Sequence, residues 1–304
     1  MRRLVIGTRG SKLALIQTDE VVAQLKDKHP QREFAVKTIR TGGDKSAEAP
    51  LASLGLGIFV KEIEDALLRG DIDMAVHSLK DLTPLLPAGL AIGAVCQRQD
   101  PRDVLINRWN CDIDGLPSGA RIGTSSPRRT AQLMAMSPES QVVPIRGNVE
   151  TRINKAFGQD YDGVLLAAAG VIRLGLQDQV SQYLSPEKFV PAPGQGALAV
   201  EIRTDDDEMA SILEAIDHLP THRAVTAERA FLERLGGGCQ EPSAAYARVS
   251  GETMVMLAFM ASPDGKQVYT TKAQGRATNP HEVAMEAHQR LIEKGAGRLI
   301  SGNG

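Results

Sequence analysis

The chain has 304 residues, of which 42% are hydrophobic and 24% are charged, and its formal net charge is −2. These values are those of ordinary globular proteins, so they exclude a disordered and a fibrous chain, and the length suits two or three domains. A net charge this close to zero gives no overall attraction to nucleic acid or to an anionic membrane. Any electrostatic function must therefore be local.

The sequence carries no sign of export or of membrane insertion. No stretch approaches the roughly 18 uncharged apolar residues of a spanning helix. The opening MRRLVIGTRG has no long apolar core followed by a small-residue cleavage site. We therefore expect a cytoplasmic protein that binds neither nucleic acid nor membranes.

The cysteines argue against a disulfide framework and against a metal site. Cys96, Cys111 and Cys239 are odd in number and form no C-x-x-C pair. A proline also interrupts the one pair of histidines spaced four apart, so we expect no metal. We assign Cys96 and Cys111 to the core, as buried small side chains.

The first 200 residues alternate short β-rich runs with helical patterns, which is typical of parallel sheets joined by crossover helices. The pattern predicts a strand at LVIGT, a helix capped by Ser11, a helix from Phe59 that stops at Gly70, and a strand at IDMAVHS. Lys80 and Asp81 follow this strand, so we place them at its carboxyl end.

From about residue 102 the rhythm repeats. ARIGTSS, QVVPIRG and DGVLLAAA predict strands, and PRRTAQLMAM and NVETRINKAF predict helices. PAPGQGALAVEI predicts a segment that returns the chain to the first domain. After about residue 219 a helix over 221–235 precedes three antiparallel strands at AAYARVSG, TMVMLAFMA and KQVYTTKAQG, and Asn279 begins a closing helix that ends at Gly295.

The segment TSSPRR predicts an anion site. If Ser126 caps the helix and Pro127 takes its first position, Arg128 and Arg129 stand in the first turn, where backbone N–H groups already favour negative charge. Two arginines there oppose the helix dipole, so they call for an anionic partner. A surface salt bridge and a bound ligand are equally good partners.

Two further arginine sites follow the same strand-to-helix pattern. Arg146 ends a strand in PIRGN, with Arg152 about one turn along the next helix, and Arg9 takes the corresponding place in the first domain. Ligands of open α/β sheets bind at the carboxyl ends of the strands. We therefore expect a ligand that bears several carboxylates or phosphates, held by guanidinium groups. The absence of a phosphate-loop motif disfavours a nucleotide.

Two residues are candidates for chemistry. Asp81 is either one half of a solvated Lys-Asp pair or a carboxylate that neutralises a cationic intermediate in a basic crevice. Cys239 lies in GGGCQEP, just after three glycines, and a thiol on such a loop is either inert or an accessible nucleophile.

Ten ordered segments resemble the porphobilinogen deaminase (hydroxymethylbilane synthase) family over nearly the whole chain: GTRGSKLAL, FVKEIEDALL, DMAVHSLKDL, DPRDV, GTSSPRR, RGNVETR, AAAGVIRLG, PGQGALAVE, TAERAFL and GGGCQEP. The resemblance implies an α/β fold with two domains similar to type II periplasmic binding proteins, each with a mixed, mainly parallel sheet, and an active site in the cleft between them. It also implies a smaller C-terminal α+β domain with an antiparallel sheet. The expected domains are 1–98 with 195–216, 99–194, and 217–304.

The resemblance implies a transferase of tetrapyrrole biosynthesis, expected to be a monomer. Four porphobilinogen molecules each lose ammonia and are joined head to tail on a dipyrromethane cofactor, and water finally releases hydroxymethylbilane. By matched motif, the cysteine that holds the cofactor as a thioether is Cys239. The aspartate that binds pyrrole N–H groups and stabilises positive charge is Asp81.

The same matching assigns residues to the carboxylates, because each porphobilinogen carries an acetate and a propionate. The residues expected to hold the cofactor are Lys80, Ser126, Arg128 and Arg129, and those expected to hold the substrate or growing chain are Arg9, Ser11, Arg146, Arg152 and Arg173. One segment departs from the family pattern. The stretch SLGLGIF, from Ser53 to Phe59, is apparently one residue shorter and lacks the lysine that many members carry there.

The main alternative is a binding module, a two-lobed protein that captures a polycarboxylate small molecule without transforming it. The first two domains alone permit this function. A third domain with a thiol loop is not needed for simple capture, so the sequence favours the enzyme.

Overall fold

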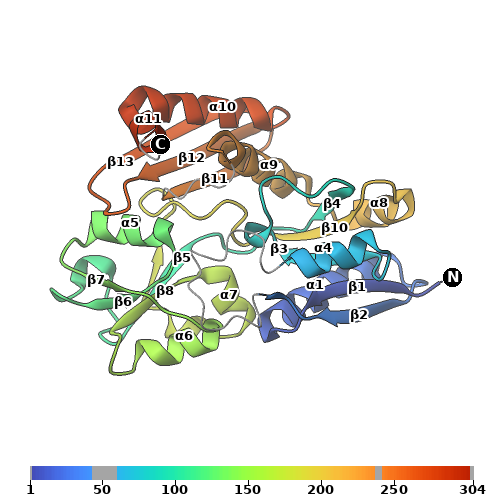
Figure 1. The fold of residues 1–304 in the computed structure, drawn as a ribbon, viewed down its shortest axis with the longest axis horizontal. Helices are drawn as coiled ribbons and strands as arrows, with labels where there is room; N and C mark the ends of the chain where they lie inside the picture. Colours follow the sequence, from blue (N-terminus) through green and yellow to red (C-terminus); the bar gives the residue numbers. More distant parts are fainter. Residues whose placement is uncertain (1, 43–59, 237–241, 302–304) are drawn as a thin grey trace. The chain divides into compact units, whose positions relative to one another are not determined.

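Contacts divide the chain into two compact units, Met1–Gln99 with Gly196–His222 and Asp100–Gln195 with Arg223–Gly304. The computed structural model describes residues 2–42, 60–236 and 242–301 (Figure 1). Cys239 and the Ser53–Phe59 segment lie outside the described residues. The division into three domains stays a prediction.

Unit 1 is built on a five-stranded mixed sheet with the strand order β2-β1-β3-β10-β4. The strands are β1 (Leu4–Arg9), β2 (Phe34–Ile39), β3 (Met74–Ser78), β4 (Leu90–Val95) and β10 (Leu198–Arg203). β1 pairs in parallel with β2 and β3, whereas β10 runs antiparallel to β3 and β4. The chain therefore returns to this sheet through β10, between two strands formed much earlier in the sequence.

Helices cover both faces of this sheet. They are α1 (Lys12–Lys28), α4 (Lys61–Leu68) and α8 (Asp207–Leu213), with short 3-10 turns η1 (Leu79–Asp81) and η4 (Glu214–Ile216). α1 begins as predicted, because the Ser11 hydroxyl accepts a hydrogen bond from the backbone N–H of Ala14 at 3.2 Å. Val21 and Leu25 of α1 belong to the core on one face, and Ile63 of α4 belongs to the core on the other. Consequently the first four residues of β3 are all buried, on both faces of the strand.

Unit 2 repeats the same arrangement in a second five-stranded sheet of order β7-β6-β8-β5-β9. Its strands are β5 (Asp103–Asn107), β6 (Arg121–Gly123), β7 (Gln141–Val143), β8 (Gly163–Ala167) and β9 (Gln182–Leu184). Again the fourth strand in the order, β5, is antiparallel to its neighbours, while β6 pairs in parallel with β7 and β8. The helices and turns are η2 (Ile113–Gly115), α5 (Pro127–Met136), α6 (Val149–Ala156), α7 (Ala168–Arg173) and η3 (Gln177–Gln179).

Unit 2 also contains an antiparallel sheet of three strands, β11 (Ser243–Ser250), β12 (Thr253–Ala261) and β13 (Val268–Arg276). α9 (Leu219–Arg234) precedes it, and α10 (Pro280–Leu291) packs along it (Figure 1). The predicted end of the closing helix at Gly295 is confirmed. The helix continues from α10 through the turn η5 (Ile292–Ala296) to this residue, whose φ of 105° is not helical, and a further short helix, α11 (Gly297–Ser301), follows. With two mixed sheets and one antiparallel sheet, the predicted fold class is confirmed.

The two cysteines assigned to the core differ in burial. Cys96 is buried in the core of unit 1, as predicted. The assignment of Cys111 is wrong, because this residue lies half-buried after β5, with its Sγ 3.6 Å from Oδ1 of Asn107.

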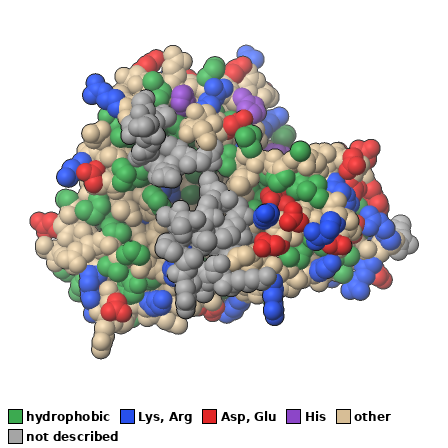
Figure 2. All heavy atoms as spheres, in the orientation of Figure 1, with side chains coloured by type: hydrophobic (Ala, Val, Ile, Leu, Met, Phe, Trp, Pro, Cys, Tyr) green, Lys and Arg blue, Asp and Glu red, His purple; other side chains and the backbone are tan. Residues whose placement is uncertain are grey.

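On the face drawn in Figure 2, acidic and basic side chains are interspersed. Within the described ranges, no helix combines the length and apolar character needed to cross a membrane.

Candidate active site

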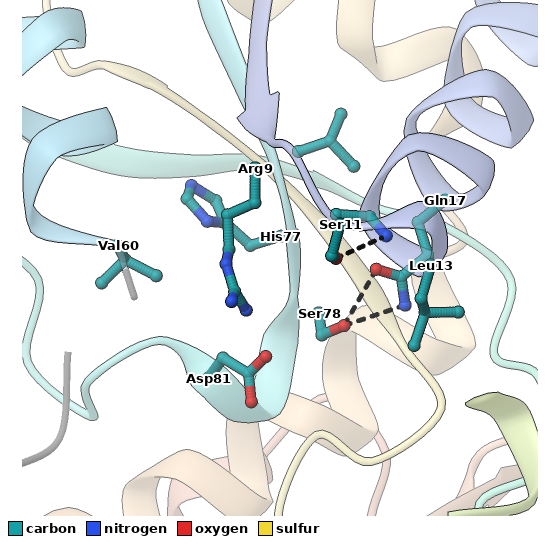
Figure 3. Close-up of a pocket in the computed structure, with 10 residues that line it drawn as sticks. Arg9, Ser11, Leu13, Gln17, Val60, His77, Ser78 and Asp81 are labelled. Carbon is teal, nitrogen blue, oxygen red and sulfur yellow. Dashed lines mark hydrogen bonds between the residues drawn. The ribbon is translucent and has the colours of Figure 1, made fainter. Parts of the chain in front are cut away.

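A small pocket of about 70 Å³ lies where β1 and β3 end in unit 1 (Figure 3). Its wall includes three residues singled out from the sequence, Arg9, Ser11 and Asp81. Arg9 is the last residue of β1, Ser11 is the N-cap of α1, and Asp81 ends the turn η1 that follows β3. Because β1 and β3 are parallel, their carboxyl ends meet at one edge of the sheet. The fold thereby brings these residues together.

Two hydrogen bonds and a buried leucine side chain hold the backbone in place around Asp81. Leu79 is 1% exposed, and its backbone N–H donates to the carbonyl of Ala197 at 3.0 Å. The side-chain amide of Gln17 donates to the Ser78 hydroxyl at 2.9 Å, which ties α1 to the end of β3. Figure 3 shows the guanidinium end of Arg9 turned toward the carboxylate of Asp81. The pocket therefore presents a cation and an anion to the same small space.

Lys80, the predicted cofactor ligand beside Asp81, lies half-buried in η1. It does not line the pocket with Asp81, because the wall residues of η1 and β3 are Val76, His77, Ser78 and Asp81.

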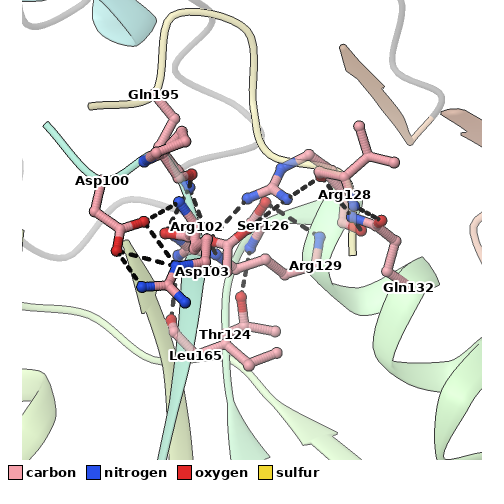
Figure 4. Close-up of polar contacts among 12 residues, drawn as sticks. Asp100, Arg102, Asp103, Thr124, Ser126, Arg128, Arg129, Gln132, Leu165 and Gln195 are labelled. Atoms are coloured by element: carbon pink, nitrogen blue, oxygen red, sulfur yellow. Dashed lines mark hydrogen bonds and ion pairs between the residues drawn. The ribbon is translucent and has the colours of Figure 1, made fainter. Parts of the chain in front are cut away.

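In unit 2, Arg128 and Arg129 converge on Asp103, a residue of β5 (Figure 4). The two terminal nitrogens of Arg128 contact the two carboxylate oxygens of Asp103 at 2.7 and 3.1 Å, and Nη2 of Arg129 lies 2.7 Å from Oδ1. Asp103 is 0% exposed and the arginines are 6% and 7% exposed. The sequence predicted an anionic partner for Arg128 and Arg129, and a buried aspartate is one such partner. A surface salt bridge is not needed to explain the two arginines.

The charges of this cluster do not cancel. Burial alone would raise the pKa of Asp103, but Arg128 and Arg129 outweigh burial and hold that pKa well below its ordinary value. Two guanidinium groups and one carboxylate leave an excess of one positive charge in a place with little access to water. Such an excess favours the approach of a further anion.

The predicted caps of this region are present. Ser126 caps α5 by accepting from the backbone N–H of Arg129 at 3.4 Å, and Pro127 takes the first helical position. Gln195 also donates to Asp103, at 3.2 Å, and Glu228 of α9 accepts from the backbone N–H of Gly194 at 2.7 Å. The hydrogen bonds around the cluster thus extend into the segment that precedes β10.

The three remaining predicted arginines lie elsewhere in unit 2, one in a loop and two in helices, and all three are half-buried. Arg146 follows β7, and Arg152 stands in α6, where its Nε donates to the carbonyl of Gly147 at 2.7 Å. Gly147 has a φ of 117°, and a Cβ there would lie 2.7 Å from Cγ2 of Thr151, so this turn requires glycine. Arg173 ends α7.

Sequence reasoning missed the polar residues that hold these groups. Asp103 was visible in DPRDV as a charged residue at the start of an apolar run, VLI, which is the signal of a buried polar group. Gln17, Gln195 and His77 carry no comparable signal, because each sits in a run whose pattern only indicates a helix, a turn or a strand.

The chain matches known protein families over most of its length. The family described as "Porphobilinogen deaminase, dipyromethane cofactor binding domain" matches residues 4–211, and "Porphobilinogen deaminase, C-terminal domain" matches 222–293. Proteins called porphobilinogen deaminase are similar throughout: one from Geobacillus sp. (strain WCH70) is 48% identical and one from Geobacillus kaustophilus is 49% identical, each covering 99% of this chain and 97% of its own. One from Carboxydothermus hydrogenoformans is 46% identical over 98% of this chain and 96% of its own.

Among solved structures, a YaeC-family lipoprotein from Enterococcus faecalis aligns with 78% of this chain and 98% of its own, at 13% identity and a TM-score of 0.45. A likeness this weak adds nothing to the argument. The sequence matches define the chain as an enzyme, a transferase, as predicted. It belongs to the porphobilinogen deaminase family, and the resemblance found from its motifs is confirmed.

Proposed function

We propose that this chain deaminates four porphobilinogen molecules, links them head to tail on a dipyrromethane primer, and then releases hydroxymethylbilane by hydrolysis. The observation that carries the proposal is the pocket where Asp81 and Arg9 face the same space. A substrate with carboxylates and a departing amino group needs both, a guanidinium for a carboxylate and a carboxylate for the positive charge that develops as the C–N bond breaks.

Each addition breaks the C–N bond of one porphobilinogen, with loss of ammonia. A C–C bond then forms to the free α-carbon of the growing pyrrole chain, and that carbon loses its proton. Asp81 accepts hydrogen bonds from pyrrole N–H groups and stabilises the positive charge of the deaminated pyrrole. In unit 1, the residues proposed to hold carboxylates of the substrate or growing product are Arg9 and Ser11. In unit 2, they are Arg146, Arg152 and Arg173.

The charges of unit 2 suit the primer. A dipyrromethane bound through Cys239 would supply the α-carbon nucleophile for the first addition. Its carboxylates match the excess positive charge of the Arg128, Arg129 and Asp103 cluster, so a carboxylate would share these guanidinium groups with Asp103. Ser126, at the cap of the same helix, and Lys80 complete the proposed set.

Intact mass of the denatured protein tests the attachment. We expect an excess mass equal to two linked pyrrole units in the wild type, absent in Cys239→Ser and retained in Cys111→Ser, which removes a half-buried thiol that has no proposed role. If no adduct forms even after porphobilinogen is added, the cofactor and the enzyme assignment both fall, and the polycarboxylate-binding module becomes the better account.

We further infer that the protein works as a monomer in the cytoplasm. The role of its family in the biosynthesis of a small-molecule precursor supports this inference. Sedimentation of the purified protein tests the monomer, since a species of twice the chain mass of 32.6 kDa at working concentration contradicts it.

A further inference from the structure

Three ionisable side chains lie buried beside the Asp81 pocket, and none has a role so far. His77 comes from β3, Glu201 from β10 and Glu64 from α4, and they are 5%, 0% and 7% exposed. Nε2 of His77 lies 3.1 Å from Oε2 of Glu201. His77 also lines the pocket that contains Asp81 (Figure 3). These three residues, here called the His77 cluster, therefore reach the pocket wall through one member.

The sheet register explains how the cluster forms. β10 is antiparallel to β3, with Glu201 opposite Ala75 and Ala199 opposite His77. Glu201 and His77 are thus diagonal neighbours on one face of the sheet, within reach of each other's side chains. α4 packs over this same face, where its apolar residues share a core with Ala75, and it brings Glu64 to the cluster.

The cluster has more acceptors than donors. Oε1 of Glu201 and Oε1 of Glu64 are buried without a hydrogen-bond partner among the described residues. For Glu64, burial without a partner for Oε1 favours the neutral form, because an unpaired buried charge is costly. Burial, with the help of the Glu201 carboxylate, raises the pKa of Glu64 to about 7, while His77 opposes the shift. The residues that the structure describes include no group of three or more His, Cys, Asp or Glu arranged to hold a metal ion.

Charged groups on each neighbouring element bear on the cluster. On α4, Asp65 adds to the repulsion at Glu64. On β10, Arg203 is paired with Asp206 at 2.5 Å, so its charge is balanced locally. On β1, Arg9 reaches the same pocket as His77. The net charge next to the pocket therefore changes when Glu64 gains or loses its proton. His77 and Arg9 are the pocket residues on which this change acts.

We propose that the His77 cluster holds one exchangeable proton whose loss adds negative charge behind the Asp81 pocket, which makes Glu64 and His77 positioning residues for substrate binding. The inference rests on the proposed function, which places a carboxylate-bearing substrate at Arg9 and Asp81. The added charge attracts Arg9 and repels the substrate carboxylates. KM is therefore expected to rise with pH through the range in which Glu64 ionises, with little change in kcat.

Steady-state kinetics of the holoenzyme with porphobilinogen, at about pH 6 and about pH 8, test this inference. Between the two we expect KM of the wild type to rise roughly threefold to tenfold, and KM of Glu64→Gln to change by less than about twofold. The control is Glu214→Gln, which removes an exposed carboxylate of the same unit and should keep the wild-type rise. Equal KM ratios in the wild type and Glu64→Gln overturn the inference.

Unfolding provides a second measurement that needs no substrate. An acid whose pKa is raised by folding lowers stability as the pH climbs from its ordinary value through its folded value, here about 7. The wild type should therefore lose stability between about pH 5 and about pH 8, and Glu64→Gln should not. The unfolding midpoint of the variant should rise relative to that of the wild type over this range. An unchanged difference means that Glu64 holds no such proton. Failure of the proposed function is a separate outcome, because it would appear as no turnover of porphobilinogen by the wild type and would leave this unfolding result intact.

Discussion

Asp81→Asn is expected to lower kcat by at least about 10³-fold, because it removes a fixed negative charge from the place where positive charge develops. The asparagine has the size of the aspartate and keeps an acceptor for pyrrole N–H groups, so binding should suffer much less than turnover. The chain around residue 81 is anchored by Leu79 and by the bond between Gln17 and Ser78, and neither contact uses the Asp81 carboxylate. The fold should therefore survive the change.

Release of product in the steady state and the mass of pyrrole units bound to the protein together measure this effect. A variant that carries the primer but adds further units slowly locates the defect in the chemical step. The matched control is Asp19→Asn, an exposed position on α1 in the same unit, which should turn over at the wild-type rate. Near-normal turnover of Asp81→Asn, or of Asp81→Ala, would remove the role proposed for this carboxylate.

The starts of helices and the ends of strands were predictable because their signals are local. Ser11 and Ser126 each cap a helix by accepting a hydrogen bond from the backbone N–H three residues further along the chain. Each such cap depends only on a short stretch of sequence. The end of β3 follows in the same way from a short apolar run before Leu79. Local signals of this kind fixed where the strands end, and the carboxyl ends of the strands hold the candidate pocket.

The partners of the buried charges were not predictable, because they depend on strand register. His77 and Glu201 are in contact although 124 residues of sequence separate them. Glu201 belongs to β10, the antiparallel fourth strand of the sheet, which comes from a distant segment of the sequence. The alternation in IDMAVHS indicates a strand, but it does not show that α1 and α4 bury its two faces. For the same reason the sequence left the partner of Arg128 open between a salt bridge and a ligand, and it did not show that β5 places Asp103 against this arginine.

Asp103→Asn is expected to destabilise unit 2 by about 3 to 5 kcal/mol, because removing one partner of a buried ion pair leaves the other charge uncompensated. Here two guanidinium groups, 6% and 7% exposed, would share the loss. The asparagine keeps one acceptor for Arg128 but carries no charge to balance either arginine. Unfolding by denaturant, followed by a probe in unit 2, measures the change.

The pH dependence of this loss separates the ion pair from simple packing. Folding depresses the pKa of Asp103, so the carboxylate stabilises the folded state above the ordinary aspartate pKa and loses that contribution as the pH falls through the folded value. The difference between variant and wild type should therefore stay constant above about pH 5 and shrink in acid. Asp264→Asn is the control, because its pair with Lys266 is 54% and 85% exposed, so solvent screens it and it should contribute little to stability. If Asp103→Asn is no worse than this control, the arginines do not depend on Asp103, and the excess positive charge offered to a cofactor carboxylate must have another source.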